Sequence, residues 1–148
     1  MSLNPHNPLG LTTRDPAEYQ AAQGEHRLRK LQQQIRYLWG NEDYFRPRFL
    51  AAGLTSPEDI RTLDDFRRLP AFMDKASHRQ SQEDSLARYN HPFGLHLTAP
   101  LESVIHLAGT SGTTGKPTFY AFTKRDLEIS HQTLARLFAQ AGIRPGET

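Results

Sequence analysis

The residues best suited to chemistry lie together in one short segment, Thr110-Ser-Gly-Thr-Thr-Gly-Lys-Pro-Thr118. Hydroxyl groups donate hydrogen bonds, glycine lets backbone N–H groups converge on a ligand, and lysine adds a positive charge. These are the properties that a polyphosphate-binding loop requires. The candidate ligand-binding residues are Thr110, Ser111, Gly112, Thr113, Thr114, Gly115 and Lys116.

The segment differs from the common nucleotide-binding P-loop. That motif has a glycine where this chain has Thr110, and a Ser or Thr directly after the lysine, where this chain has Pro117. Because proline lacks an N–H donor and interrupts helices, the segment is expected to lead into a strand, which disfavours a kinase or GTPase site. Composition leaves two interpretations open: a phosphate-binding loop, and a flexible hairpin connection rich in Gly, Thr and Ser.

Strands are predicted on both sides of this segment, over 103–108 and 118–122, because both stretches are rich in β-branched and aromatic residues. Thr123 with Asp126 is a hydroxyl–carboxylate helix-start signal, and the helix that follows is expected to stop at Gly142 and Pro145. One face of this helix is marked at helical spacing by Leu127, His131, Leu134, Phe138 and Ala141.

Helices are predicted upstream of the strands. Apolar residues recur at helical spacing from Pro16 to a helix end near Gly40, and a second short helix precedes Gly53. Two further starts are signalled by Ser56 with Asp59 and by Thr62 with Asp65. The aromatic residues expected in the core are Trp39, Tyr44, Phe45 and Phe49.

The polar stretch 74–90 is weakly periodic and is interpreted as a helix followed by a long surface loop, and 91–97 as a turn into an extended segment. The predicted fold class is therefore a truncated α/β unit: N-terminal helices, then a strand, the glycine-rich loop, a second strand and a C-terminal helix. Residues 1–13 are expected to form an N-terminal arm, and 14–148 the N-terminal portion of one domain.

Composition narrows the function classes. The 18 basic and 16 acidic residues are interspersed along the chain, so neither a nucleic-acid-binding stripe nor a membrane-surface patch is expected. The absence of cysteine excludes disulfides and thiolate chemistry. With no signal peptide or membrane span in the sequence, a cytoplasmic protein is predicted.

Other titratable residues are better explained by structure than by chemistry. The seven histidines, including His91 and His96, show no metal-ligand spacing and are expected on the surface or in loops. His106 is expected to alternate outward along its strand, with a ligand contact as the other possibility. The acidic pair at 64 and 65 is expected to cap a helix rather than to catalyse a reaction.

The order of residues adds a family resemblance. TSGTTGKPT closely resembles the phosphate loop of the adenylate-forming superfamily. PFGL at 92–95 and AGIRPGE at 141–147 follow the order seen in phenylacetate-CoA ligases, and FRPRFLAAGL at 45–54 and DIRTLDDFRRLP at 59–70 resemble the N-terminus of that family. The chain departs from the family pattern at His91, where tyrosine is usual, and at 121–122, where Gly-Tyr is usual.

The resemblance implies that a carboxylic acid of aryl-acetate type reacts with ATP, with Mg2+ expected alongside, and that coenzyme A then displaces AMP from the acyl-adenylate. It implies hydroxyl donors at Ser111, Thr113 and Thr114, backbone donors at Gly112 and Gly115, and a mobile cation at Lys116. Since enzymes of this family are several times longer, the chain is interpreted as an N-terminal fragment or truncated relative.

The alternative is a non-catalytic, stand-alone interaction module that keeps the start of the fold. A homodimer is expected for a truncated chain, because strand edges and the apolar face of the 124–141 helix would otherwise stay uncovered, and only a complete small domain would avoid this.

Overall fold

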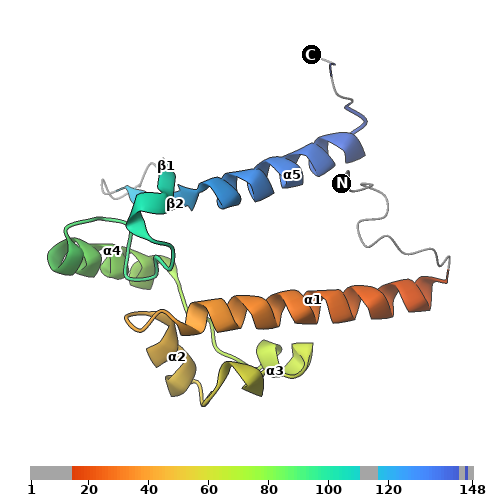
Figure 1. The fold of residues 1–148 in the computed structure, drawn as a ribbon, viewed down its shortest axis with the longest axis horizontal. Helices are drawn as coiled ribbons and strands as arrows, with labels where there is room; N and C mark the ends of the chain where they lie inside the picture. The colour runs from red at the N-terminus through yellow and green to blue at the C-terminus, as the bar shows by residue number, and fades with distance from the viewer. Residues whose placement is uncertain (1–14, 111–116, 144–145, 147–148) are drawn as a thin grey trace.

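The structure is a computed structural model that describes residues 15–110, 117–143 and 146, so the predicted arm at 1–13 lies outside the described residues. In Figure 1, α2 and α3 lie on one side of α1, whereas α4, the strand hairpin and α5 lie on the other. The elements in chain order are α1 (Pro16–Trp39), α2 (Phe45–Ala51), η1 (Pro57–Asp59), α3 (Leu63–Arg67), α4 (Lys75–Tyr89), η2 (Leu101–Ser103), β1 (Val104–Thr110), β2 (Thr118–Thr123) and α5 (Lys124–Gln140).

The apolar core lies where α1 meets α2 and the turn after it. Its buried members are Ile35, Phe49, Leu54 and Ile60. The Trp39 and Phe49 rings stack with centroids 5.6 Å apart, which confirms the prediction that these aromatic residues are core residues. Gly53 ends this region with a φ of 88°, a backbone conformation that glycine adopts without strain.

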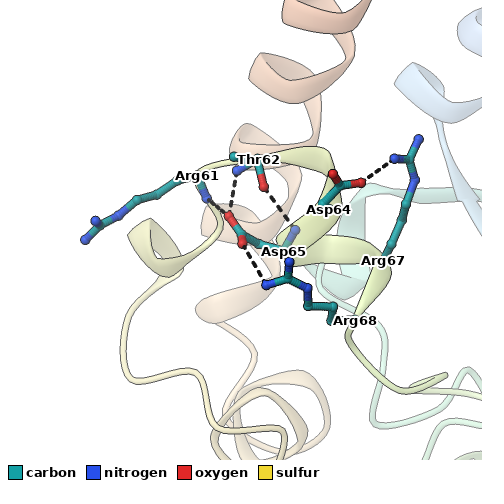
Figure 2. Close-up of polar contacts among 6 residues, drawn as sticks. All are labelled: Arg61, Thr62, Asp64, Asp65, Arg67 and Arg68. Carbon is teal, nitrogen blue, oxygen red and sulfur yellow. Dashed lines mark hydrogen bonds and ion pairs between the residues drawn. The ribbon is translucent and has the colours of Figure 1, made fainter.

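Two capping boxes stabilise the segment 55–67, which follows α2. The carboxylate of Asp59 accepts hydrogen bonds from the N–H groups of Thr55 and Ser56, at 2.7 and 3.0 Å. Figure 2 shows the second box, in which the carboxylate of Asp65 accepts from the N–H of Thr62 at 2.8 Å and the Thr62 hydroxyl accepts from the N–H of Asp65 at 3.1 Å. Both predicted starts are confirmed, although the first opens only the short 3-10 helix η1.

The acidic pair at 64 and 65 therefore stabilises the start of α3. Asp65 completes the capping box, and Asp64 forms an ion pair with Arg67 one turn later (Figure 2). The hydrogen bonds from the backbone and side chain of Thr62 lower the pKa of Asp65, as expected for a carboxylate that must stay ionised to cap a helix.

Residues 75–89 form one continuous helix, α4, so the long surface loop predicted in the second half of this stretch is wrong. Asn90 ends the helix in the left-handed conformation, with a φ of 56°. The buried face of α4 is polar and comprises His78, Ser81, Gln82 and Ser85. Because these residues follow helical spacing without being apolar, a search for apolar periodicity cannot detect the helix.

The turn predicted at the start of 91–97 is confirmed, but a second turn at 95–96 lies where the extended segment was predicted. The Leu95 N–H donates to Ser81 O on α4 at 3.1 Å, and the Leu97 N–H donates to Gly94 O at 3.1 Å. Gly94 has a φ of 95°, and a Cβ at this position would overlap the His96 ring. The close approach of that ring therefore requires glycine here.

Strands β1 and β2 form an antiparallel hairpin in which Thr110 pairs with Thr118 and Gly109 with Phe119. The predicted order of strand, loop, strand and helix is confirmed, and the Thr123 hydroxyl with Asp126 caps α5 as expected. The described part of the chain is thus mostly helical, with one two-stranded hairpin. None of its helices is both long and apolar enough to cross a membrane.

The core can be tested with two neighbouring residues of α2. Phe49 is 2% exposed and Leu50 is 51% exposed. We expect Phe49→Ala to lower the free energy of unfolding by about 3–5 kcal/mol, because it removes a buried ring and leaves a cavity. Leu50→Ala is the matched control and should change it by less than about 1 kcal/mol. Urea unfolding followed by Trp39 fluorescence measures both, and equal losses would contradict the assigned core.

Candidate functional site

The hairpin brings together the two ends of the candidate loop. Thr110 is the last residue of β1 and is exposed, whereas Thr118 is the first residue of β2 and is buried. The two threonines pair directly across the strands. The other candidate residues, Ser111, Gly112, Thr113, Thr114, Gly115 and Lys116, lie outside the described residues. The prediction that the chain runs from Pro117 into a strand is confirmed.

An open hollow of about 640 Å³ lies beside this pair of threonines. Its walls come from the start of α4, from the 91–97 turns and from the hairpin. Lys75 supplies a cation beside the carboxylate of Asp74, and the threonines and Tyr120 supply hydroxyl groups, so the lining is polar and offers several hydrogen-bond donors. The lining residues are Met73, Asp74, Lys75, His78, His96, Thr110, Thr118 and Tyr120.

Two histidine rings form one wall of this hollow. The rings of His78 and His96 meet edge to face with centroids 4.5 Å apart, and His78 contacts the Tyr120 ring at 5.1 Å. The Ser81 hydroxyl is 3.0 Å from His96 Nδ1. Nε2 of His78 is buried and has no hydrogen-bond partner among the described residues.

Burial disfavours the charged form of both rings. It lowers the pKa of His78, and burial together with the neighbouring His78 lowers the pKa of His96 to about 4. The expectation that the histidines lie on the surface or in loops is wrong for His78, which is 6% exposed on α4. It is confirmed for His106, an exposed residue of β1.

Polar side chains of α4 connect the helix to the hairpin and to the 91–97 turns. The Gln82 amide nitrogen donates to Pro92 O at 2.9 Å and to Phe119 O at 3.0 Å. Arg79 Nε donates to the Thr118 hydroxyl at 3.5 Å, and the Ser85 hydroxyl donates to His91 O at 2.8 Å. Sequence reasoning missed these residues, and their helical spacing was the one available signal.

A second hollow, of about 550 Å³, separates α1 from α5. Its lining includes the aromatic rings of Tyr37, Phe93, Tyr120 and Phe122, with Arg125 at the start of α5. This wall is more apolar than that of the first hollow. Within the described ranges, no group of three or more His, Asp or Glu side chains could hold a metal ion.

The sequence was compared with known proteins and with protein-family models. No protein-family model matches the chain. The chain is 36% identical over 131 residues to a phenylacetate-coenzyme A ligase of Thermus thermophilus, which is 88% of this chain and 26% of that protein. It is 32% identical over 123 residues to a phenylacetate-coenzyme A ligase of Pseudomonas putida, which is 83% of this chain and 25% of that protein.

A solved structure agrees with the sequence matches. It is the crystal structure of a 2-hydroxyisobutyryl-CoA ligase in complex with 2-HIB-AMP and CoA in the thioesterification state. It superposes on 91% of this chain with a TM-score of 0.75 and 33% sequence identity, and the match covers 26% of that ligase chain.

Fold and sequence together show that the chain is similar to one region of the adenylate-forming acyl-CoA ligases. Within that class, the chain is homologous to the N-terminal portion of the phenylacetate-CoA ligases. The chain spans about a quarter of the length of these relatives.

The histidine pair predicts how stability depends on pH. His96 has its ordinary pKa near 6.5 in the unfolded chain and a pKa of about 4 in the folded one. The unfolded state therefore takes up a proton first, and the free energy of unfolding should fall as the pH drops from about 6.5 toward about 4.

Urea unfolding at about pH 7.5 and about pH 5 measures this loss. The His96→Gln variant keeps a polar partner for Ser81 and should lose less stability between the two pH values than the wild type. The control is His106→Gln, which alters an exposed ring on β1. An unchanged pH dependence in His96→Gln would contradict the assignment.

Proposed function

We propose that this region supplies the phosphate-binding part of an ATP-dependent carboxylic acid–CoA ligase of aryl-acetate type. In that reaction the acid and ATP form an acyl-adenylate and pyrophosphate, and the thiol of coenzyme A then displaces AMP to form the thioester. The observation that carries the proposal is the TSGTTGKPT segment between the paired ends of β1 and β2. The similarity to a ligase solved with 2-HIB-AMP and CoA supports an acyl-adenylate and coenzyme A as ligands.

The proposed roles follow from the residue types. The hydroxyl groups of Ser111, Thr113 and Thr114 and the backbone N–H groups of Gly112 and Gly115 donate to the β- and γ-phosphates, and Lys116 offsets their charge as pyrophosphate leaves. Lys75 and Thr110 line the adjacent hollow, so the described residues offer a cation and a hydroxyl in keeping with a phosphate ligand.

Magnesium is expected to accompany the nucleotide rather than to occupy a protein cage. Asp74, the carboxylate that lines the hollow, accepts from the Ser77 N–H at 2.7 Å and caps α4. Mg2+ in nucleotide sites is commonly bound by phosphates, waters and one or two carboxylates. This chain would contribute to that arrangement chiefly by holding the phosphates.

The phosphate-binding role can be tested on the 148-residue chain itself. Titration with magnesium pyrophosphate or ATP, followed by amide chemical shifts, should give saturable changes at Thr110, Thr118 and Lys75. We expect weak binding, with a dissociation constant on the order of 1 mM or above, because phosphate contacts are present without the apolar burial of a complete nucleotide site. Lys116→Ala should weaken it by about tenfold, the value of one charge-assisted contact.

The matched control is Lys124→Ala, which removes another lysine at the far end of β2, where α5 begins. It should bind pyrophosphate like the wild type. If these amides do not respond to either ligand, or if both lysine variants weaken binding equally, the phosphate role fails for this chain and the alternative of a non-catalytic interaction module is favoured.

We also propose that two copies of this region associate through α5. The helix exposes large apolar side chains, with Leu137 at 57% and Phe138 at 50%. Exposed apolar faces of this extent are typical of interfaces. The face comprises Leu134, Leu137 and Phe138.

Light scattering should therefore report a homodimer. The double variant Leu134→Asp and Phe138→Asp should be monomeric, because burying a carboxylate in an apolar interface carries a large desolvation cost. Gln132→Asp, at another exposed position of the same helix, is the control and should remain dimeric. A wild-type monomer at high concentration would contradict the proposal.

A further inference from the structure

The second residue of strand β2, Phe119, has its backbone N–H and C=O hydrogen-bonded to a side chain. The Phe119 N–H lies 3.4 Å from Gln82 Oε1, and Phe119 O accepts from Gln82 Nε2 at 3.0 Å. In an antiparallel pair, every second residue directs its N–H and C=O away from the partner strand. Phe119, paired with Gly109 on β1, directs these groups toward α4.

The Gln82 carboxamide therefore takes the place of a third strand at this position. A primary amide presents an acceptor and a donor side by side, as a backbone peptide group does. Its second N–H donates to Pro92 O at 2.9 Å, which connects the 91–97 turns to the same group. Gln82 is 7% exposed, so these contacts are shielded from water.

This contact between Gln82 and Phe119 lies next to the first hollow. Phe119 lies between Thr118 and Tyr120, which both line that hollow. Lys75 and His78 line it from the first turns of the helix that carries Gln82. A shift of β2 relative to α4 would therefore change the spacing between the hydroxyl groups and the cation.

We propose that Gln82 is a positioning residue: its carboxamide holds the start of β2 against α4 and so sets the distance of Thr118 and Tyr120 from Lys75 in the first hollow. This inference rests on the proposed function. An apolar side chain of the same length would fill the space but would leave Phe119 N–H, Phe119 O and Pro92 O without partners, and unpaired buried polar groups are costly. The geometry thus explains why glutamine is used here.

The test compares Gln82→Met with Gln80→Met. Gln80 lies on the same helix, is exposed, and donates to Asp84 Oδ1 at 2.9 Å. In Gln82→Met, hydrogen exchange at the Phe119 N–H should accelerate, and magnesium pyrophosphate should bind about tenfold more weakly, as expected for the loss of buried hydrogen bonds. Gln80→Met should change neither quantity.

A Gln82→Glu variant adds a measurement that would not change if the side chain at position 82 only filled space. When protonated, its carboxyl group can donate to Phe119 O and accept from the Phe119 N–H, as the amide does. When ionised, it can only accept, and it repels the oxygens of Phe119 and Pro92. Pyrophosphate affinity should therefore be nearer to wild type at about pH 5.5 than at about pH 8.

Other charged and titratable groups near Gln82 also affect the pH profile, so the wild type serves as its reference. Arg79 and Glu83 on α4 surround Gln82, and His78 and His96 also take up protons in acid. Each variant is therefore compared with the wild type at the same pH, and Gln80→Glu is the charge-matched control. Because the pH profile does not use Gln82→Met, it remains decisive if that variant does not fold.

The outcomes separate this inference from the proposed function. If Gln82→Met accelerates exchange at Phe119 but binds pyrophosphate like the wild type, the positioning role is wrong. A Gln82→Glu profile parallel to the wild type would also overturn it. If the wild type binds no pyrophosphate, the proposed function fails and the role of Gln82 toward phosphate fails with it, whereas the Phe119 exchange rate still reports whether the amide holds β2.

Discussion

Helix α4 turns polar side chains inward and uses them to bond backbone groups of two other segments. Gln82 bonds Pro92 and Phe119, and Ser85 bonds His91. The Leu95 N–H returns a bond to Ser81 O. These hydrogen bonds join buried side chains of α4 to partly buried backbone groups, and breaking one would leave its partners unsatisfied. The placement of the hairpin, and so of Thr110 and Thr118, depends on this polar contact.

The apolar core reaches the same region through a few bridging residues. Asn41, just after α1, donates to Leu95 O at 2.9 Å and accepts from the Tyr44 N–H at 2.8 Å. The Tyr44 hydroxyl donates to Phe72 O at 3.2 Å, and its ring packs against His96. These contacts therefore connect the core of α1 and α2 to the turns that line the first hollow, rather than to the hairpin directly.

The region combines a packed core with open surfaces. One hollow offers hydroxyl groups and a cation beside the paired threonines, and the other offers aromatic side chains between α1 and α5. The chain spans about a quarter of the ligases that it resembles, and α5 exposes an apolar face. The proposed phosphate-binding role needs this combination, since the core must hold the loop while other surfaces remain available to the rest of a site.

The sequence by itself determined the local elements, because their signals are local. Capping residues Asp59, Asp65 and Asp126 act within a few positions of the helix starts that they stabilise, and TSGTTGKPT is contiguous. Only the tertiary structure decided the length of α4, the burial of His78 and the contact of Gln82 with Phe119, residues 37 positions apart. A glutamine or a histidine can face water or a backbone partner equally well, and the choice is made by whichever distant segment packs against it.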